Sequence, residues 1–229
     1  NNIIDCTLGT TASSNPYVQV TENLLLGCYQ GASGTKGRYW SGIINKFGVW
    51  FKQLTDDEIN QVFRKSGGNS GQNASLVFQI DSTSMNTADN TLTDNIAGIS
   101  ATLTGNPTVS DNQIAFTASD TFSFDISSLN LTNSDRTFRV KFTPTTLDNN
   151  TRNVMIVGDS PTDWGVVTCT YMTNAKLIMQ HPNKNFSNCT VGATLGSAVE
   201  NRLPGIPIAN TEYEIVISEN VTNNKIRWF

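Results

Sequence analysis

Apolar and polar positions alternate most regularly between residues 44 and 63, where the period changes from that of a strand to that of a helix. Over residues 44–51, apolar side chains occupy every second position, which predicts a strand with two different faces. One face of this strand consists of Phe47, Val49 and Phe51. Apolar residues then recur at i, i+3 and i+4, which predicts a helix with one apolar stripe. The stripe consists of Ile59, Val62 and Phe63.

The predicted helix has a clear start signal at residues 55–58, which read Thr-Asp-Asp-Glu. The Thr55 hydroxyl can accept a hydrogen bond from the N–H of Glu58, and the Glu58 carboxylate can accept one from the N–H of Thr55. Leu54 and Ile59 occupy the positions of a hydrophobic staple. We therefore expect one short helix near residues 55–64. Its leading acids are interpreted as structural, because negative charge is favourable at a helix N-terminus.

The rest of the chain is typical of short β-strands separated by turns. In residues 137–143, Phe138, Val140 and Phe142 share one face of an alternating strand. Residues 113–126 are expected to form a pair of strands. Their aromatic side chains, expected in the core, are Phe116, Phe122 and Phe124. Further strands are predicted within residues 1–9, 18–29, 76–81, 153–158, 165–172, 176–180, 212–219 and 225–229.

Residues 37–59, GRYWSGIINKFGVWFKQLTDDEI, resemble the closing segment of laminin-G-like, concanavalin-A-like jelly-roll domains. In that family a strand of this type runs into a short terminal helix. The matching positions are Tyr39, Trp40, Gly42, Ile44, Phe47, Val49, Trp50, Leu54, Thr55, Glu58 and Ile59. The resemblance implies an all-β fold, an antiparallel β-sandwich of jelly-roll type with one short helix. It says little about activity, because this fold hosts lectins, adhesins, glycosidases and structural modules.

The segments stand in an unusual order for that family. Residues 76–81 resemble the first strand of such a domain, yet the closing segment precedes them. Joined tail to head, residues 225–229 and 1–9 read as one hairpin with its turn at Asn1-Asn2. We interpret residues 1–229 as one circularly permuted jelly-roll domain. Residues 1–65 would be the C-terminal half of the family order, 66–75 a linker, and 76–229 the N-terminal half. The alternative is two neighbouring repeats, each cut at mid-domain.

Composition narrows the classes of function. Only 15% of the residues are charged and the net charge is −4, whereas a nucleic-acid interface needs clustered Lys and Arg. No apolar run approaches the roughly 20 residues of a membrane span, so we expect neither nucleic-acid binding nor membrane insertion. The sequence leaves disulfides and free thiols equally open for the cysteines, which are Cys6, Cys28, Cys169 and Cys189.

The sequence does not favour catalysis. Retaining glycosidases on this fold carry their carboxylates as E-x-D-x-x-E or E-x-D-x-E on one strand, and no such run is present. Glu212 and Glu214 share a strand face but lack a third acid, a pattern more typical of plain surface. His181, the only histidine, stands without a nucleophile elbow or zinc-ligand spacing. We therefore expect a protein that is not an enzyme, with a glycoside hydrolase as the most distant alternative.

Binding of a carbohydrate needs exposed aromatic rings with polar groups nearby. Trp164 beside Asp163, in the loop-like sequence SPTDWG, is the leading candidate. The other candidate aromatics are Tyr29, Tyr39 and Trp40, and at least one of the last two should face inward. Trp50 and Trp228 are assigned mainly to packing.

Many relatives in the resembled family bind calcium through loop oxygens. Calcium is therefore a candidate cofactor, and its candidate ligands are Asp81, Asp94 and Asp159. Solvated loop acids and turn formers are the alternative interpretation of these residues.

These observations favour a non-catalytic recognition module that binds a glycan or cell-surface ligand. The resemblance and the Asn-, Thr- and Ser-rich composition indicate a larger extracellular or virion-surface protein, for instance a phage tail or fibre. The alternative is a purely structural or protein-interaction module that spaces or oligomerises a fibre or capsid, in which case a homo-oligomer is expected.

Overall fold

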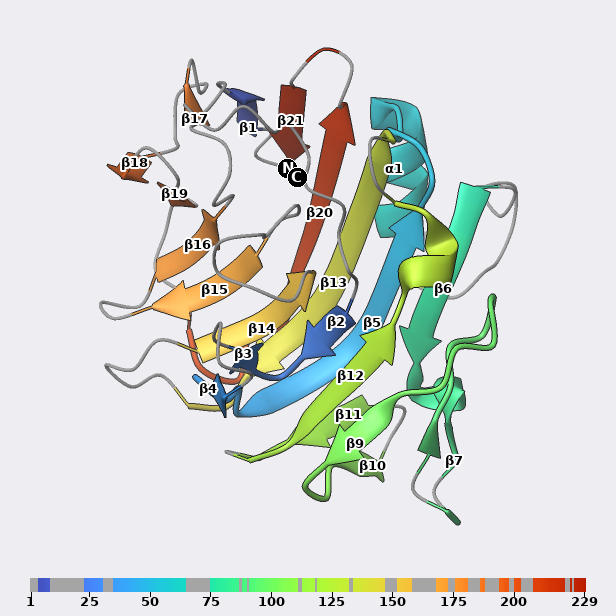
Figure 1. Cartoon of the computed structure of the whole chain (residues 1–229). Helices are drawn as coiled ribbons and strands as arrows, with labels where there is room; N and C mark the ends of the chain where they lie inside the picture. Colours follow the sequence, from blue (N-terminus) through green and yellow to red (C-terminus); the bar gives the residue numbers. More distant parts are fainter. Residues whose placement is uncertain are drawn as a thin grey trace.

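Two antiparallel sheets face each other in the computed structural model of this chain (Figure 1). The structure describes all residues except 1–3, 9–22, 31–34, 65–74, 87, 90, 111–112, 118, 132–133, 147–151, 158–167, 173–175, 181–185, 188–193, 198–199, 203–207, 221–222 and 224. The prediction of an antiparallel β-sandwich with one short helix is confirmed for this part of the chain. The jelly-roll topology stays a prediction.

The first sheet has nine strands. In spatial order they are β10 (Thr108–Ser110), β11 (Gln113–Phe116), β5 (Gly42–Trp50), β13 (Arg136–Pro144), β20 (Tyr213–Asn220), β21 (Lys225–Trp228), β1 (Ile4–Leu8) and β17 (Phe186–Ser187), with β6 (Leu76–Asp81) also paired to β5.

The second sheet has eight strands. They are β18 (Thr194–Ser197), β19 (Glu200–Arg202), β16 (Lys176–Gln180), β15 (Thr168–Met172), β14 (Arg152–Val157), β2 (Asn23–Leu26), β12 (Thr121–Asp125) and β9 (Thr102–Thr104). Two small ribbons pair β3 (Tyr29–Gln30) with β4 (Lys36–Gly37), and β7 (Met85–Asn86) with β8 (Thr91–Leu92). Short 3₁₀ turns span Ser82–Ser84 and Ser127–Leu129.

Strand β5 is the most connected element of the first sheet. It pairs with β13 along one side, and on the other side with β11 near its start and β6 near its end. Phe47 and Val49 face the core, as the alternation predicts. Ile44 also faces the core, although strict alternation would place it on the other face, because the register of β5 against β13 shifts between Ile44 and Lys46. The placement of Phe51 on the same face is wrong: β5 ends at Trp50, and Phe51 is 41% exposed. Its N–H bonds to the carbonyl of Ser75, 2.7 Å away, where the chain is leaving the sheet.

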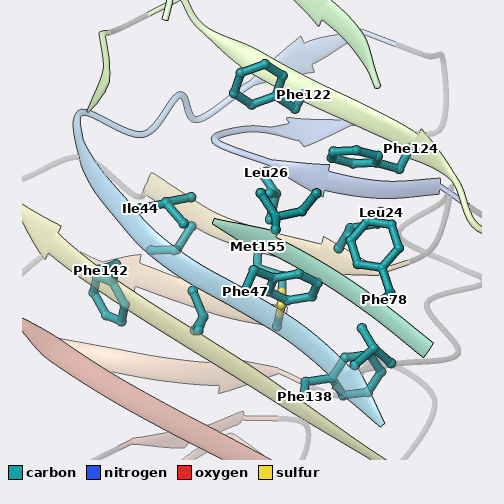
Figure 2. Close-up of a cluster of buried hydrophobic side chains, with 14 of the residues drawn as sticks. Leu24, Leu26, Ile44, Phe47, Phe78, Phe122, Phe124, Phe138, Phe142 and Met155 are labelled. Carbon is teal, nitrogen blue, oxygen red and sulfur yellow. The ribbon is translucent and has the colours of Figure 1, made fainter. Parts of the chain in front are cut away.

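The main core lies between the two sheets and joins residues from the segments 1–65 and 76–229 (Figure 2). Phe78 of β6 makes edge-to-face contacts with Phe47 of β5, at 5.9 Å between ring centroids, and with Phe124 of β12, at 5.1 Å. Phe78 therefore bridges the two sheets. The predicted core residues Phe116, Phe122, Phe124, Phe138, Val140 and Phe142 are all buried, which confirms those assignments.

The two strands predicted within residues 113–126 do not pair with each other. Strand β11 belongs to the first sheet and β12 to the second, so the chain crosses between the layers at this point. Buried Asp120 holds the crossing: its carboxylate accepts hydrogen bonds from the N–H groups of Thr117, at 2.6 Å, and Asn106, at 2.8 Å. These bonds fix the turn, and the strands that it joins separate into different layers.

Strands β1 and β21 lie side by side in antiparallel register, with Ile4 opposite Trp228 and Thr7 opposite Lys225 (Figure 1). This is the tail-to-head pairing that the sequence suggested. The two sequence halves also share one core, because Leu24 and Phe47 pack in the same cluster as Phe78 and Phe124. The circularly permuted order itself stays a prediction.

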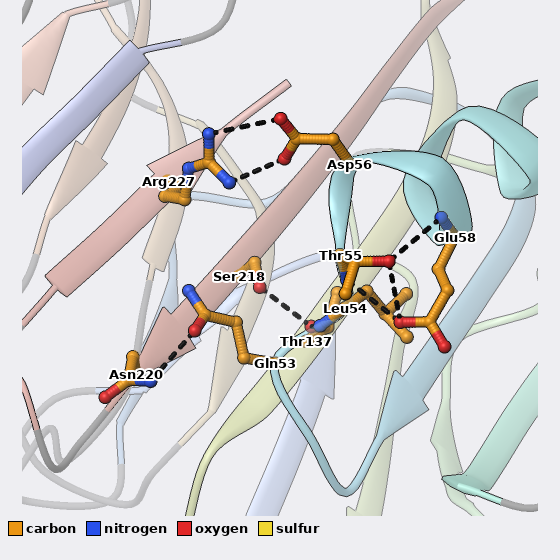
Figure 3. A network of polar contacts seen from close by, with 9 residues as sticks. All are labelled: Gln53, Leu54, Thr55, Asp56, Glu58, Thr137, Ser218, Asn220 and Arg227. Atoms are coloured by element: carbon orange, nitrogen blue, oxygen red, sulfur yellow. Dashed lines mark hydrogen bonds and ion pairs between the residues drawn. The ribbon is translucent and has the colours of Figure 1, made fainter.

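Helix α1 (Asp56–Arg64) covers part of the outer face of the first sheet. Trp50 and Val216 alternate with core residues and so point outward, where they pack with Leu54, Ile59 and Val62. The staple pair Leu54 and Ile59 is fully buried, as predicted. The segment entering the helix is also tied to the sheet, since the Leu54 N–H donates to Thr137 Oγ1 at 3.1 Å (Figure 3).

The predicted capping box at the start of α1 is present (Figure 3). The Glu58 N–H donates to Thr55 Oγ1 at 3.3 Å, and the Thr55 N–H donates to Glu58 Oε2 at 2.9 Å. Lys52 forms an ion pair with the same carboxylate. Burial alone would raise the pKa of Glu58, but the hydrogen bonds from Lys52 and Thr55 outweigh it and hold that pKa below its ordinary value.

Glu58→Gln should therefore be less stable than the wild type at pH 7, because it loses the charged partner of Lys52. The lowered pKa of Glu58 means that its charge stabilises the fold above the ordinary pKa, and that this gain is lost as the pH falls through the folded-state value. Urea unfolding between pH 7 and pH 3 measures the effect, and the difference between the two proteins should shrink at acid pH. A difference that does not change with pH would contradict this account.

Candidate functional site

Three of the predicted site residues, Asp159, Asp163 and Trp164, lie outside the described residues. The remaining candidates fall into two groups in the structure. Tyr29, Tyr39 and Trp40 belong to the β3–β4 hairpin or its base, and Asp81 and Asp94 lie together at the edge of the first sheet beside β6.

The β3–β4 hairpin has a closed base. The Trp40 N–H donates to the carbonyl of Gly27 at 2.7 Å, and the Gly27 N–H donates to Val154 in β14 at 3.1 Å. Gly27 has a φ of 86°, and a Cβ there would lie 2.7 Å from the ring of Phe116. Only glycine fits at this position. The paired backbones, with Tyr29 opposite Gly37, bring the segments of Tyr29 and Tyr39 together.

Tyr39 and Trp40 have opposite environments, as expected of neighbours of which at least one faces inward. Trp40 is fully buried and packs edge-to-face on Phe142 at 5.6 Å, so this candidate ligand contact is instead a core residue. Tyr39 is half-buried and packs against Leu25 and Cys28, which are both fully buried. Leu25 alternates with the core residues Leu24 and Leu26, so Tyr39 lies over the outer face of the second sheet.

A lysine from the same hairpin contacts hydroxyl groups of the second sheet, and its charge acts on Cys28, on which Tyr39 packs. Lys36 Nζ donates to Thr104 Oγ1 of β9 at 3.3 Å and to Thr121 Oγ1 of β12 at 3.2 Å. Thr104 is exposed, whereas Thr121 is fully buried. We call Lys36, Tyr39 and Thr104 the hairpin surface. It combines a half-buried aromatic ring with an amine and a hydroxyl group.

Cys28 lies beneath the hairpin surface as a buried free thiol. Burial raises the pKa of this thiol to about 11, and it prevails over the nearby charge of Lys36 and the contact with Thr121, which both lower it. The thiolate is the reactive form of cysteine, so the environment makes Cys28 a packing residue.

Cys28 should accordingly react with iodoacetamide at pH 8 at least about 100-fold more slowly in the native protein than in urea, because a thiol with a raised pKa carries almost no thiolate. Mass spectrometry of the peptide that contains Cys28 measures the rate separately from the other cysteines. Equal native and denatured rates would show that the thiol is neither buried nor perturbed.

The structure brings the calcium candidates Asp81 and Asp94 into one cluster with Asn95. Asp94 is buried, and its carboxylate accepts hydrogen bonds from the N–H groups of Ile96, Ala97 and Ile99 at 2.7–2.9 Å. These contacts are those of an acid that organises a turn.

Asp81 has a similar set of donors. Its carboxylate accepts from the N–H of Thr83 at 2.9 Å, from Gln79 Nε2 at 2.8 Å and from Asn95 Nδ2 at 3.1 Å. Burial would raise the pKa of Asp81, but these hydrogen bonds outweigh it and lower the pKa. Within the described ranges, no three His, Cys, Asp or Glu side chains are grouped so that they could hold a metal ion. The contacts of Asp81 and Asp94 thus match the turn-former interpretation, while calcium binding stays a prediction.

Sequence reasoning missed Cys28 as a neighbour of Tyr39, and Lys36 as a neighbour of Thr104. Lys36 and Thr104 stand 68 positions apart in the chain, and no local pattern links them. Lys36 lies in the β3–β4 hairpin, and the proximity of this hairpin to β9 and β12 depends on the packing of the second sheet.

No protein-family model, curated protein or solved structure matches this chain. In the part of the chain that the structure describes, no helix has the length and apolar character needed to cross a membrane. The resemblance of residues 37–59 to laminin-G-like domains therefore stays a prediction.

Proposed function

We propose that this chain is a non-catalytic recognition module that binds glycans on a cell surface. The observation that supports the proposal is the hairpin surface. There the half-buried Tyr39 ring packs on Cys28, and Lys36, whose charge acts on the same Cys28, donates to the hydroxyl of Thr104. An aromatic ring can stack on a sugar face, while nearby donors and acceptors bind its hydroxyl groups.

The packing of the hairpin suits such a role. Tyr39 rests on fully buried Leu25 and Cys28, and the base of the hairpin is hydrogen-bonded to β14 through Gly27. A contact residue held by a rigid sheet loses little conformational freedom on binding. The composition and the family resemblance support a place in a larger extracellular or virion-surface protein, and Trp164 and Asp163 remain further candidate contacts.

Tyr39→Ala tests the proposal most directly at the level of one residue. We expect it to weaken binding to the best glycan of an array by at least tenfold, measured by isothermal titration calorimetry. Phe51→Ala is the matched control, because Phe51 is an exposed aromatic residue beside α1 and should leave the affinity unchanged. Unaltered affinity in Tyr39→Ala would exclude the hairpin surface as the site. A stable oligomer with no glycan signal would support a structural or protein-interaction module instead.

A further inference from the structure

The outer face of the first sheet has two different halves. Helix α1 and its apolar contacts cover the half around Trp50 and Val216. The other half carries charged side chains from four adjacent strands, β6, β5, β13 and β20. The strand register aligns these side chains across the sheet in the order Asp81, Lys46, Lys141 and Glu214, which we call the charged row.

Most members of the charged row have partners within the chain. Lys141 Nζ lies 2.8 Å from Glu212 Oε1, and Arg139 Nε lies 2.6 Å from Glu214 Oε1. Asp81 accepts hydrogen bonds from its own turn and from Asn95. The glutamates at 212 and 214, considered above as candidate acids, are thus both ion-paired.

Lys46 differs from its neighbours in the charged row. It is half-buried, and it forms no hydrogen bond or ion pair with any residue in the described part of the chain. Burial lowers its pKa, and the charges of Arg139 and Lys141 lower it further, against the opposite effect of Asp81 and Glu214. The charges of Asp81 and Glu214 thus offset burial and the neighbouring cations only in part, and neither acid forms an ion pair with this ammonium group.

The neighbouring residue is also incompletely paired. The register between β5 and β13 shifts at Lys141/Phe142, so that Asn45 is an extra residue in β5 and forms a β-bulge. The Asn45 Oδ1 atom is buried without a hydrogen-bond partner. Bulges often lie next to binding sites, where they re-aim side chains. A buried acceptor without a hydrogen-bond partner carries a free-energy cost, and such acceptors are uncommon in folded proteins.

We propose that the charged row is a second binding site, for a saccharide unit that carries a single carboxylate, with Lys46 as the contact to that carboxylate. The ligand class follows from the charges around Lys46. A polyanion would be repelled by Asp81, Glu212 and Glu214. A single carboxylate can instead pair with Lys46 while the neutral hydroxyl groups of the same sugar donate to the acids on either side. This site would deepen the proposed glycan recognition, and it rests on that function.

The test uses NMR titrations of the whole chain with the methyl glycosides of glucuronic and galacturonic acid, each compared with the methyl glycoside of glucose or galactose. Each acid differs from its neutral counterpart only in carrying a carboxylate in place of the C6 hydroxymethyl group. At least one acid should bind tenfold or more tightly than its neutral counterpart, and Lys46→Met should abolish that preference. Lys52→Met is the matched control, because Lys52 pairs with Glu58 of α1, outside both the charged row and the hairpin surface, and its loss should leave the preference intact.

If the wild type shows no preference for either acid, the inference is overturned. A preference that survives in Lys46→Met also overturns it. Tyr39-dependent binding of neutral glycans alone would keep the proposed function and reject this second site. No binding of any saccharide, acidic or neutral, would reject both.

Discussion

Arg136→Met should lower the free energy of unfolding by about 3–5 kcal/mol, because it leaves a buried carboxylate without its partner. Arg136 shares the inward face of β13 with Phe138 and Val140. Its side chain and that of Glu219 are both completely buried, with Arg136 Nε 2.8 Å from Glu219 Oε2. Arg136 Nη1 also donates to the carbonyl of Leu131 at 2.6 Å. The single substitution breaks this network at the edge of the core.

Urea unfolding followed by tryptophan fluorescence measures this effect. Lys141→Met is the control, since the pair of Lys141 and Glu212 is partly exposed and should contribute no more than about 1 kcal/mol. The double variant Arg136→Met/Glu219→Leu should recover much of the lost stability, because no unpaired buried charge remains. Equal small losses for Arg136→Met and Lys141→Met would show that the Arg136–Glu219 pair is not buried as described.

Phe78→Ala should cost a similar amount, about 3–5 kcal/mol, through the cavity that it leaves. Phe78 is fully buried, and its ring contacts Phe47 from the same sheet and Phe124 from the other (Figure 2). The substitution thus removes contacts within the first sheet and between the sheets. It also removes a side chain from residues 76–229 that packs on residues from 1–65.

Phe51→Ala is the matched control for this experiment, because Phe51 is exposed and surface substitutions usually change stability by less than about 0.5 kcal/mol. One cooperative transition that shifts as a whole in Phe78→Ala would show that both sequence halves unfold together. Two separable transitions, with only one affected, would contradict a shared core and favour the alternative of two part-domains.

Local patterns predicted much of the fold. The capping box, the staple and the strand alternation are short-range signals. They located α1, the core face of β13, and the core positions Phe47 and Val49 of β5 correctly. The failures arose where the outcome depends on distant contacts. Phe51 continued the alternation in sequence, but the chain turns away to meet Ser75.

The candidate site was less predictable than the fold. Tyr39 and Trp40 are adjacent aromatic residues, and only the packing on Phe142 and Leu25 decides which of them enters the core. Likewise, loop acids that could bind calcium and loop acids that organise turns have the same sequence pattern. The hydrogen bonds of Asp94 to three backbone N–H groups distinguish the two for that residue.

Binding of the chain to a broad glycan array, with calcium and again with a chelator, tests the central claim most directly. The account predicts a signal for at least one glycan that persists with the chelator and falls with Tyr39→Ala, because the hairpin surface contains no acidic metal ligands. A signal that the chelator removes would move the site to the loop acids, with Asp159 the next residue to substitute. The absence of any signal in both conditions would contradict glycan recognition by this chain.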